Sequence, residues 1–164
     1  MTLAEILTEI SQYECRLIEI TGGEPLIQKN VHLLIRDLCD RGYEVLLETA
    51  GHMDISTIDV RVKRIIDFKC PSSGESGKVL WDNINHLKPS DEVKFVVGCK
   101  EDLIWAAKII KEHELTNICP VIFSPVFGVM DNQMLAEWIL DSRMPVRMQI
   151  QLHKQIWDPA AKGR

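Results

Sequence analysis

The sequence lacks the features that mark membrane, secreted and nucleic-acid-binding proteins. None of its apolar runs is long enough to span a bilayer. It has no basic run and its net charge is −5, so binding along a phosphate backbone is not indicated. The N-terminal stretch MTLAEILTEI is acidic and amphipathic, unlike a signal peptide. We therefore expect a cytoplasmic protein that binds neither membrane nor nucleic acid.

The sequence also lacks closely spaced cysteines. Its five cysteines are Cys15, Cys39, Cys70, Cys99 and Cys119. No two of them are near enough in the chain for a zinc knuckle, a redox CxxC or a cluster-binding loop. Each is most simply a small buried hydrophobe, and the residues themselves predict no metal site.

Helices that alternate with short apolar strands are the main pattern in the chain. Its 164 residues suit one folded domain, 1–164, and show no linker, repeat or break in composition. Strands are expected at 17–20, 43–48, 64–69, 92–97, 118–123 and 146–152. Helices are expected from a capping box at Thr2 and Glu5, from about 31 to 41, at 81–87, at 102–113 and after Asp131.

This alternation indicates parallel strands joined by crossover helices. A doubly wound sheet and a piece of a (β/α) barrel both fit it. A complete eightfold barrel does not, because it needs roughly 250 residues.

Several predicted strands carry polar side chains on one face, although parallel strands are usually apolar on both. The polar faces carry Glu19, Thr21, Glu48, Asp67, Lys69, Lys94, Arg147, Gln149, Gln151 and His153. Solvent exposure or internal ion pairing, such as Asp67 with Lys94, would explain single positions. Because several strands share the habit, a polar ligand cavity on the concave side of the sheet is favoured.

The sharpest motif is the string Thr21-Gly22-Gly23-Glu24-Pro25, which directly follows the first predicted strand. Ligands bind at this end of parallel strands, and glycine lets a backbone approach a ligand closely. Two glycines alone would indicate only a tight turn. The whole string resembles the motif by which radical-SAM enzymes bind the methionyl amino group of S-adenosylmethionine (SAM).

Four further strings extend this resemblance along almost the whole chain. They are ETAG at 48–51, DFKCPSSGE at 67–75, SPVF at 124–127 and QIQLHKQIW at 149–157. In this order they resemble the 7-carboxy-7-deazaguanine synthase family. The fold that this resemblance implies is a partial, TIM-like (β/α) barrel of the radical-SAM type, with a mostly parallel sheet and outer helices.

The resemblance also implies roles for particular residues. The cofactor-binding residues that it implies are Gly22, Gly23, Glu24, Pro25, Thr49, Cys70, Pro71, Ser72, Ser124, Pro125, Val126 and Phe127. The substrate-binding residues are Thr21, Gln151 and His153, and His153 is also the catalytic candidate. A histidine at a strand end is as often structural as functional, so this last role stays open.

The chemistry implied by the family starts from a 4Fe-4S cluster that reduces SAM to a 5′-deoxyadenosyl radical. The radical takes a hydrogen from 6-carboxy-tetrahydropterin, and the ring contracts with loss of ammonia to give the deazaguanine precursor of queuosine. The family further implies Mg²⁺, a flavodoxin or ferredoxin as electron donor, and a homodimer.

One departure from the family concerns the cluster. Radical-SAM enzymes hold it with a CxxxCxxC loop, and this sequence contains none. We expect an N-terminal truncation that removes the first strand, the cluster loop and the magnesium ligand. The alternatives are an inert or SAM-binding-only fragment and another radical-SAM enzyme such as a glycyl-radical activase, which the closing HKxIW disfavours. A Rossmann protein is disfavoured because no GxGxxG follows the first strand.

Overall fold

The computed structural model describes residues 1–161 and contains one sheet of six parallel strands. The strands are β1 (Leu17–Ile20), β2 (Glu44–Thr49), β3 (Lys63–Lys69), β4 (Glu92–Val97), β5 (Val121–Pro125) and β6 (Arg147–Met148). Their order in the sheet is their order in the chain. A doubly wound sheet would reverse this order at a switch point, so the partial barrel is confirmed over the doubly wound alternative.

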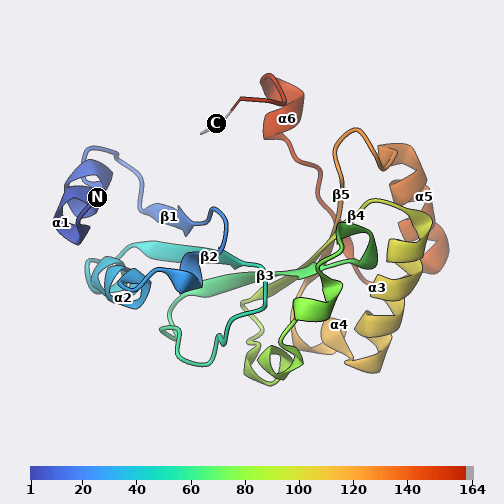
Figure 1. Ribbon diagram of the computed structural model, residues 1–164, viewed down its shortest axis with the longest axis horizontal. Coiled ribbons are helices and arrows are strands. Elements are labelled where there is room, and N and C mark those ends of the chain that lie inside the picture. The colour runs from blue at the N-terminus through green and yellow to red at the C-terminus, as the bar shows by residue number, and fades with distance from the viewer. Residues whose placement is uncertain (162–164) are drawn as a thin grey trace.

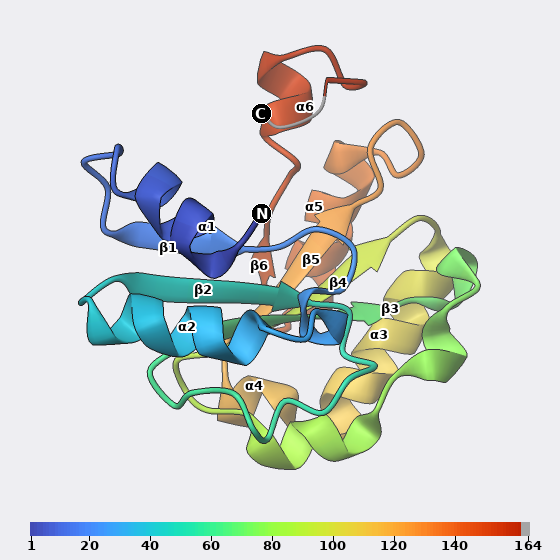
Figure 2. The same cartoon turned by 60° about the vertical axis from the view of Figure 1, so that its left-hand side comes forward.

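In residues 1–161, six α-helices accompany the sheet, and most of them cover its outer side. They are α1 (Leu3–Ile10), α2 (Val31–Asp40), α3 (Lys100–Glu112), α4 (Leu115–Ile118), α5 (Asn132–Ser142) and α6 (His153–Ile156). In Figure 2, α2, α3 and α4 lie on one side of the sheet, whereas α6 stands apart on the other. Figure 1 shows α1 and α6 at two separate margins of that second side. No helix among the described residues is long and apolar enough to cross a membrane.

The predicted capping box opens α1. The Thr2 hydroxyl accepts a hydrogen bond from the Glu5 N–H at 3.2 Å, and the Glu5 carboxylate accepts one from the Thr2 N–H at 2.7 Å. Two backbone donors that the first turn leaves without helical partners are thereby satisfied.

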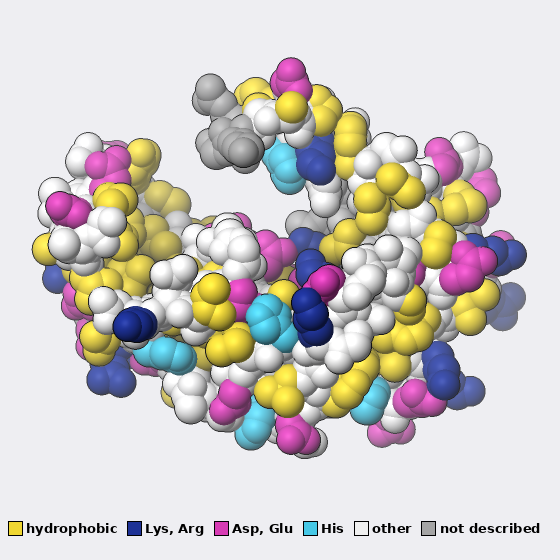
Figure 3. Space-filling view, in the orientation of Figure 1, with side chains coloured by type: hydrophobic (Ala, Val, Ile, Leu, Met, Phe, Trp, Pro, Cys, Tyr) yellow, Lys and Arg dark blue, Asp and Glu magenta, His cyan; other side chains and the backbone are white. Residues whose placement is uncertain are grey.

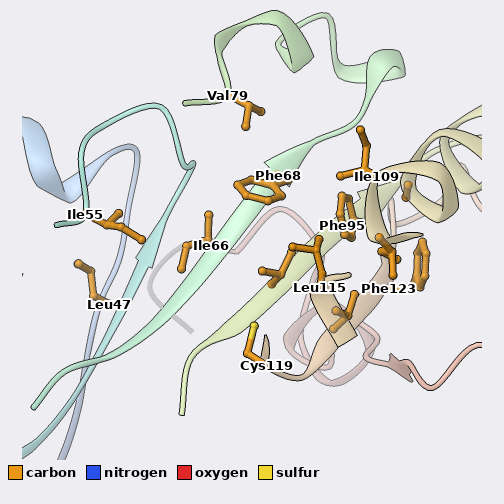
Figure 4. Close-up of a cluster of buried hydrophobic side chains, with 14 of the residues drawn as sticks. Leu47, Ile55, Ile66, Phe68, Val79, Phe95, Ile109, Leu115, Cys119 and Phe123 are labelled. Carbon is orange, nitrogen blue, oxygen red and sulfur yellow. The ribbon is translucent and has the colours of Figure 1, made fainter. Parts of the chain in front are cut away.

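The core lies between the sheet and its outer helices. Phe68 of β3, Phe95 of β4 and Phe123 of β5 are fully buried, and neighbouring rings are 5.9 Å apart between centroids (Figure 4). The helices contribute residues such as Ile35 and Leu103 to the same cluster. Since the apolar side chains of the strands point outward to the helices, the polar ones point to the inner, concave side.

Two predicted elements differ from the structure in the middle of the chain. Residues 81–87 form a 3-10 helix, Trp81–His86, instead of an α-helix. The strand expected at 118–123 is displaced toward the C-terminus, because Leu115–Ile118 forms the short helix α4.

The last predicted strand, 146–152, is wrong for most of its length, because β6 contains only two residues. The Gln149 N–H still donates to the Phe123 carbonyl of β5 at 2.9 Å. In this alternation the next β5 residue that faces β6 is Pro125, which has no N–H to donate. The ladder therefore stops, and His153 begins α6 instead of ending a strand.

Candidate cofactor and substrate site

The turn after β1 has the backbone geometry that its two glycines permit. Gly22 has φ +98° and Gly23 has φ +56°, a region that side chains oppose. A Cβ built on either residue would meet no atom within 4 Å, so the space beside the turn is open. The backbone of this turn can therefore be approached closely by a ligand.

Glu24 fastens the turn to the end of β2. Its buried carboxylate accepts hydrogen bonds from the Thr49 hydroxyl at 2.8 Å, the Ala50 N–H at 2.9 Å and the Leu26 N–H at 3.1 Å. The His52 Nδ1 lies 3.6 Å from the same group. The side chains of Glu24 and Thr49 are thus used inside the protein, and only the backbone of the turn remains for a ligand.

A groove of about 670 Å³ lies beside this turn, between α1 and the start of α2. Thr21, Gly22 and Pro25 form one wall of it, and the rest consists of apolar residues of α1 and α2 together with the polar segment 28–30. Figure 3 shows a further, broad hollow between α1 and α6, over the concave side of the sheet. The turn therefore borders enough open space for a ligand of cofactor size.

The concave side of the sheet carries a row of ion pairs. The Lys94 Nζ of β4 lies 2.7 Å from the Glu48 carboxylate of β2, which also accepts a hydrogen bond from the Thr21 hydroxyl at 3.1 Å. The Lys69 Nζ of β3 lies 2.5 Å from the Asp67 carboxylate. The ion pair of Asp67 with Lys94 that the sequence offered as an alternative is not formed, because Asp67 pairs with Lys69 and Lys94 pairs with Glu48.

A cavity of about 410 Å³ opens over this row. Its polar lining consists of Glu19, Glu48, Lys63, Glu92, Lys94, Ser124, Gln149, Gln151 and His153. Four of the predicted polar strands contribute predicted polar side chains to it, whereas Asp67, Lys69 and Arg147 do not line it. The polar cavity predicted for the concave side is thus present, with a lining that differs in part from the predicted one.

In this row the pKa of Glu48 and the pKa of Asp67 are shifted in opposite directions. Burial raises the pKa of Glu48, but the hydrogen bond and charge of Lys94 and the hydrogen bond of Thr21 outweigh it, so the net shift is downward. Burial raises the pKa of Asp67, and Lys69 and Lys94 only partly oppose this. The Asp67 Oδ1 is buried and has no hydrogen-bond partner in the described part of the chain, which fits a carboxyl that holds a proton more readily than usual.

The predicted cofactor segment after β3 is divided between the core and the surface. Cys70 is fully buried, and this burial raises its thiol pKa, so only its backbone can face a ligand. Pro71 and Ser72 are exposed in a 3-10 helix, Pro71–Ser73. The Ser72 N–H and hydroxyl donate to the Asp102 carboxylate at 3.0 and 2.5 Å.

The predicted segment 124–127 reaches a smaller cavity of about 240 Å³. Pro125 and Phe127 line this cavity, and Gln151 lines both it and the larger polar one. Among residues 1–161 the buried Gln151 Oε1 has no hydrogen-bond partner, so it can accept a hydrogen bond from a ligand in either cavity. The Lys154 Nζ of α6 lies 5.5 Å from the centre of the Phe127 ring.

The structure thus brings Thr21, Gln151 and His153 to the polar cavity or its margin, and it places the glycine turn at the same end of the sheet. The sequence predicts Glu48 and Lys94 on the polar, concave face but gives neither a binding role, and it gives Asp102 no place at the site. The face alternation contained the signal for Glu48 and Lys94. Asp102 had no signal beyond an acidic residue in the first turn of a helix.

The side chains that could bind a metal ion are not clustered in the described part of the chain. Among residues 1–161, no three His, Cys, Asp or Glu side chains lie together as a metal ion would need. Cys39, Cys70 and Cys119 are buried in the core, and Cys15 is exposed. The residues described here therefore do not fit a 4Fe-4S cluster or a carboxylate-bound Mg²⁺ site.

Two solved structures share the fold. The crystal structure of QueE from Escherichia coli superposes with a TM-score of 0.72 and 19% identity, over 92% of this chain and 64% of that one. The structure of Streptococcus suis SuiB bound to S-adenosylmethionine gives a TM-score of 0.56 and 12% identity, over 89% and 40%. The chain spans less than two thirds of either structure.

The sequence comparisons reach further than the fold, although no family model matches the chain. A 7-carboxy-7-deazaguanine synthase from Chlorobaculum tepidum is 43% identical over 99% of this chain and 76% of its own length. The enzyme of the same name from Koribacter versatilis is 39% identical over 90% and 71%. With this identity, and with a fold and glycine turn that agree, the chain belongs to the 7-carboxy-7-deazaguanine synthase family.

Proposed function

We propose that this chain binds SAM at the Gly22–Gly23 turn and 6-carboxy-tetrahydropterin in the polar cavity, as part of 7-carboxy-7-deazaguanine synthesis. The observation that carries the proposal is the pairing of an open left-handed glycine turn with a charged cavity on the concave side of the same parallel sheet. When bound, SAM supplies the hydrogen-abstracting group of this chemistry.

The residues of the chain would orient the two ligands. The backbone donors and acceptors of the turn would hold the amino end of SAM, since the Glu24 carboxylate already accepts hydrogen bonds from Thr49 and Ala50. The pterin presents N–H donors, a carbonyl and a carboxylate, which match Glu48 and Lys94 in the cavity. His153 at the cavity margin and the free acceptor of Gln151 would complete the substrate contacts.

A second candidate function is binding of SAM or the pterin without turnover. The cysteines favour this second candidate, because the sequence has no CxxxCxxC loop and no three potential metal ligands lie together among the described residues. We therefore assign no step through the cluster or Mg²⁺ to these residues. The electron donor, the homodimer and a cytoplasmic location remain proposals from the family.

Calorimetric titration of the chain with SAM and, separately, with 6-carboxy-tetrahydropterin tests the proposal. We expect both to bind. Iron and sulfide analysis after anaerobic reconstitution, with 5′-deoxyadenosine measured under reducing conditions, separates the two candidates: we expect no stable cluster and no SAM cleavage. Cluster binding with cleavage would exclude the binding-only candidate, and failure of SAM to bind would overturn the proposal as a whole.

A further inference from the structure

Asp102 is a fully buried carboxylate whose hydrogen-bond partners all belong to two loops and carry no charge. Its Oδ1 accepts from the Ser72 N–H at 3.0 Å, and its Oδ2 accepts from the Ser72 hydroxyl at 2.5 Å and the Gly98 N–H at 2.8 Å. Burying a charge is costly unless donors surround it, so this arrangement holds the donors in place as firmly as it holds the carboxylate.

Asp102 and the two residues that donate to it lie where three segments meet at the end of β4. Ser72 belongs to the loop after β3, Gly98 directly follows β4, and Asp102 lies in the first turn of α3. Nothing in the hydrogen bonding of the sheet requires the loop after β3 to fold against β4. Asp102 supplies that connection, 30 residues away in sequence from Ser72.

Gly98 brings the third segment to the same place. A Cβ at Gly98 would meet the Ser72 Oγ at 3.1 Å, the Asp102 Oδ2 at 3.6 Å and a Val126 methyl group at 3.6 Å. The Val126 N–H also donates to the Val97 carbonyl at 2.9 Å. The segments 70–72 and 124–127 are thus both fastened to the same short stretch, Val97 and Gly98.

The pKa of Asp102 agrees with this geometry. Burial raises it, but the hydrogen bonds from Ser72 and Gly98 outweigh burial, so the pKa lies below that of an ordinary aspartate. The carboxylate is therefore charged at neutral pH and accepts from all three donors at once.

We infer that Asp102 is the positioning residue of the SAM site, and that it acts through Ser72 and Gly98 without touching the cofactor. The inference rests on the proposed function, and it takes over the expectation from the family resemblance that segments 70–72 and 124–127 line the SAM site together with the glycine turn. Loss of the negative charge would release Ser72 and widen the gap between the two segments. SAM affinity would then fall, while the pterin cavity, which Asp102 does not border, would be unaffected.

The test compares SAM and pterin affinities by calorimetry in the intact chain. Asp102→Asn removes the charge and one acceptor with little change in shape, and we expect SAM to bind about tenfold more weakly with unchanged pterin affinity. Glu101→Gln is the matched control, because Glu101 lies in the same helical turn but is exposed, and it should change neither affinity.

A second pair of variants covers the case in which Asp102→Asn fails to fold. Ser72→Ala removes the hydroxyl donor and should weaken SAM binding about threefold, whereas Ser72→Thr keeps the hydroxyl and should restore it. Where the Asp102→Asn chain folds, adding Ser72→Ala to it should cost nothing further, since both changes break one connection.

The outcomes separate the two proposals. If the unaltered chain binds SAM and Asp102→Asn binds it equally well, the positioning role is wrong and the proposed function stands. Additive effects of the two changes would show that Ser72 acts independently of Asp102, which also overturns the role. If the unaltered chain binds no SAM, the proposed function falls and the positioning role falls with it.

Discussion

Gly22 and Gly23 have backbone angles that disfavour any side chain, although no neighbouring atom blocks a Cβ there. The strain of a substitution at these positions is therefore conformational and not steric. The open space that it would fill is the space that a ligand needs. Glycine at this turn thus serves both the chain reversal and close approach.

Gly23→Ala should separate these two effects. We expect it to lower the free energy of unfolding by about 1 kcal/mol and to weaken SAM binding, which urea denaturation and calorimetry measure. Gly42→Ala is the matched control, because Gly42 has φ +80°, an equally open surrounding and a place at the other end of β2. It should cost similar stability and leave SAM binding unchanged. Equal SAM binding in both variants would show that the turn is not the SAM site.

Lys94→Met tests how far the charge of Lys94 stabilises the ionised Glu48 carboxylate in the polar cavity. In the unaltered chain the folded-state pKa of Glu48 is lowered, so its stabilising contribution is present above the ordinary glutamate pKa and is lost as pH falls below it. Without Lys94, burial would dominate and raise that pKa, and the buried charge would destabilise the fold as pH rises. We expect a loss of roughly 1–3 kcal/mol at pH 7 and a smaller loss near pH 4, by urea denaturation.

A surface lysine gives the comparison for this variant. Lys108 pairs with Glu112 one helical turn away on α3, and both side chains are exposed. Lys108→Met should change the free energy of unfolding by less than about 0.5 kcal/mol at either pH. A Lys94→Met loss that does not depend on pH would argue against a charge effect in the cavity.

At the scale of the elements, Arg64 ties β3 to the turn before β4. Its guanidinium and the Asp91 carboxylate are both buried, at 2.5 Å, and it also donates to the Ile55 carbonyl at 3.1 Å. Asp91 accepts further hydrogen bonds from the Arg64 and Lys88 N–H groups. One ion pair therefore holds the amino ends of two strands and a connecting loop together.

Arg64→Met should be strongly destabilising, because it leaves the Asp91 charge buried without its cation. We expect a loss of about 3–5 kcal/mol in the free energy of unfolding, measured with urea. The exposed Arg61 pairs with Asp59 and Asp40, and Arg61→Met should lower the free energy of unfolding far less than Arg64→Met does. Similar losses in the two variants would mean that burial does not control the effect.

The sequence predicted strands well where apolar residues run between turn signals. β1 and β4 have the predicted bounds, since nothing else competes for those residues. The last strand was predicted too long because alternation in 146–152 is a local signal, whereas its end depends on Pro125 in a neighbouring strand. The role of Asp102 was not predictable for the same reason, because its partner Ser72 is distant in sequence and only the fold brings the two together.

The site was predictable to the extent that its residues lie in recognisable strings. Gly22, Gly23 and His153 stand in such strings, and face alternation selected Lys94 and Gln151. Which lysine pairs with which carboxylate could not be read from alternation, because neighbouring strands offer several partners at similar register.

At the scale of the whole molecule, the sheet is an open, curved wall with charges on its inner side. At the amino ends of the strands, the Glu92 carboxylate accepts from Lys63 at 2.9 Å and from Arg147 at 2.6 Å, which joins β3, β4 and β6. The glycine turn follows the carboxyl end of β1, and the polar cavity extends over the concave side from Lys63 and Glu92 to Gln151 and His153. Since the strand order never closes on itself, β1 and β6 remain as end strands among the described residues.

The free side of β1 should drive self-association. Backbone groups of an end strand that have no neighbour recruit other strands, and Leu17 in this strand is 48% exposed. We expect the chain to form concentration-dependent oligomers in sedimentation velocity runs, and Leu17→Lys to reduce them, because a charge at a strand edge opposes pairing. Leu140→Lys places the same charge on the exposed side of α5, where the side chain is 75% exposed, and should leave the oligomers unchanged. If the unaltered chain stays monomeric at high concentration, β1 does not drive association. Equal effects of Leu17→Lys and Leu140→Lys on the oligomers would also show that β1 is not the associating edge.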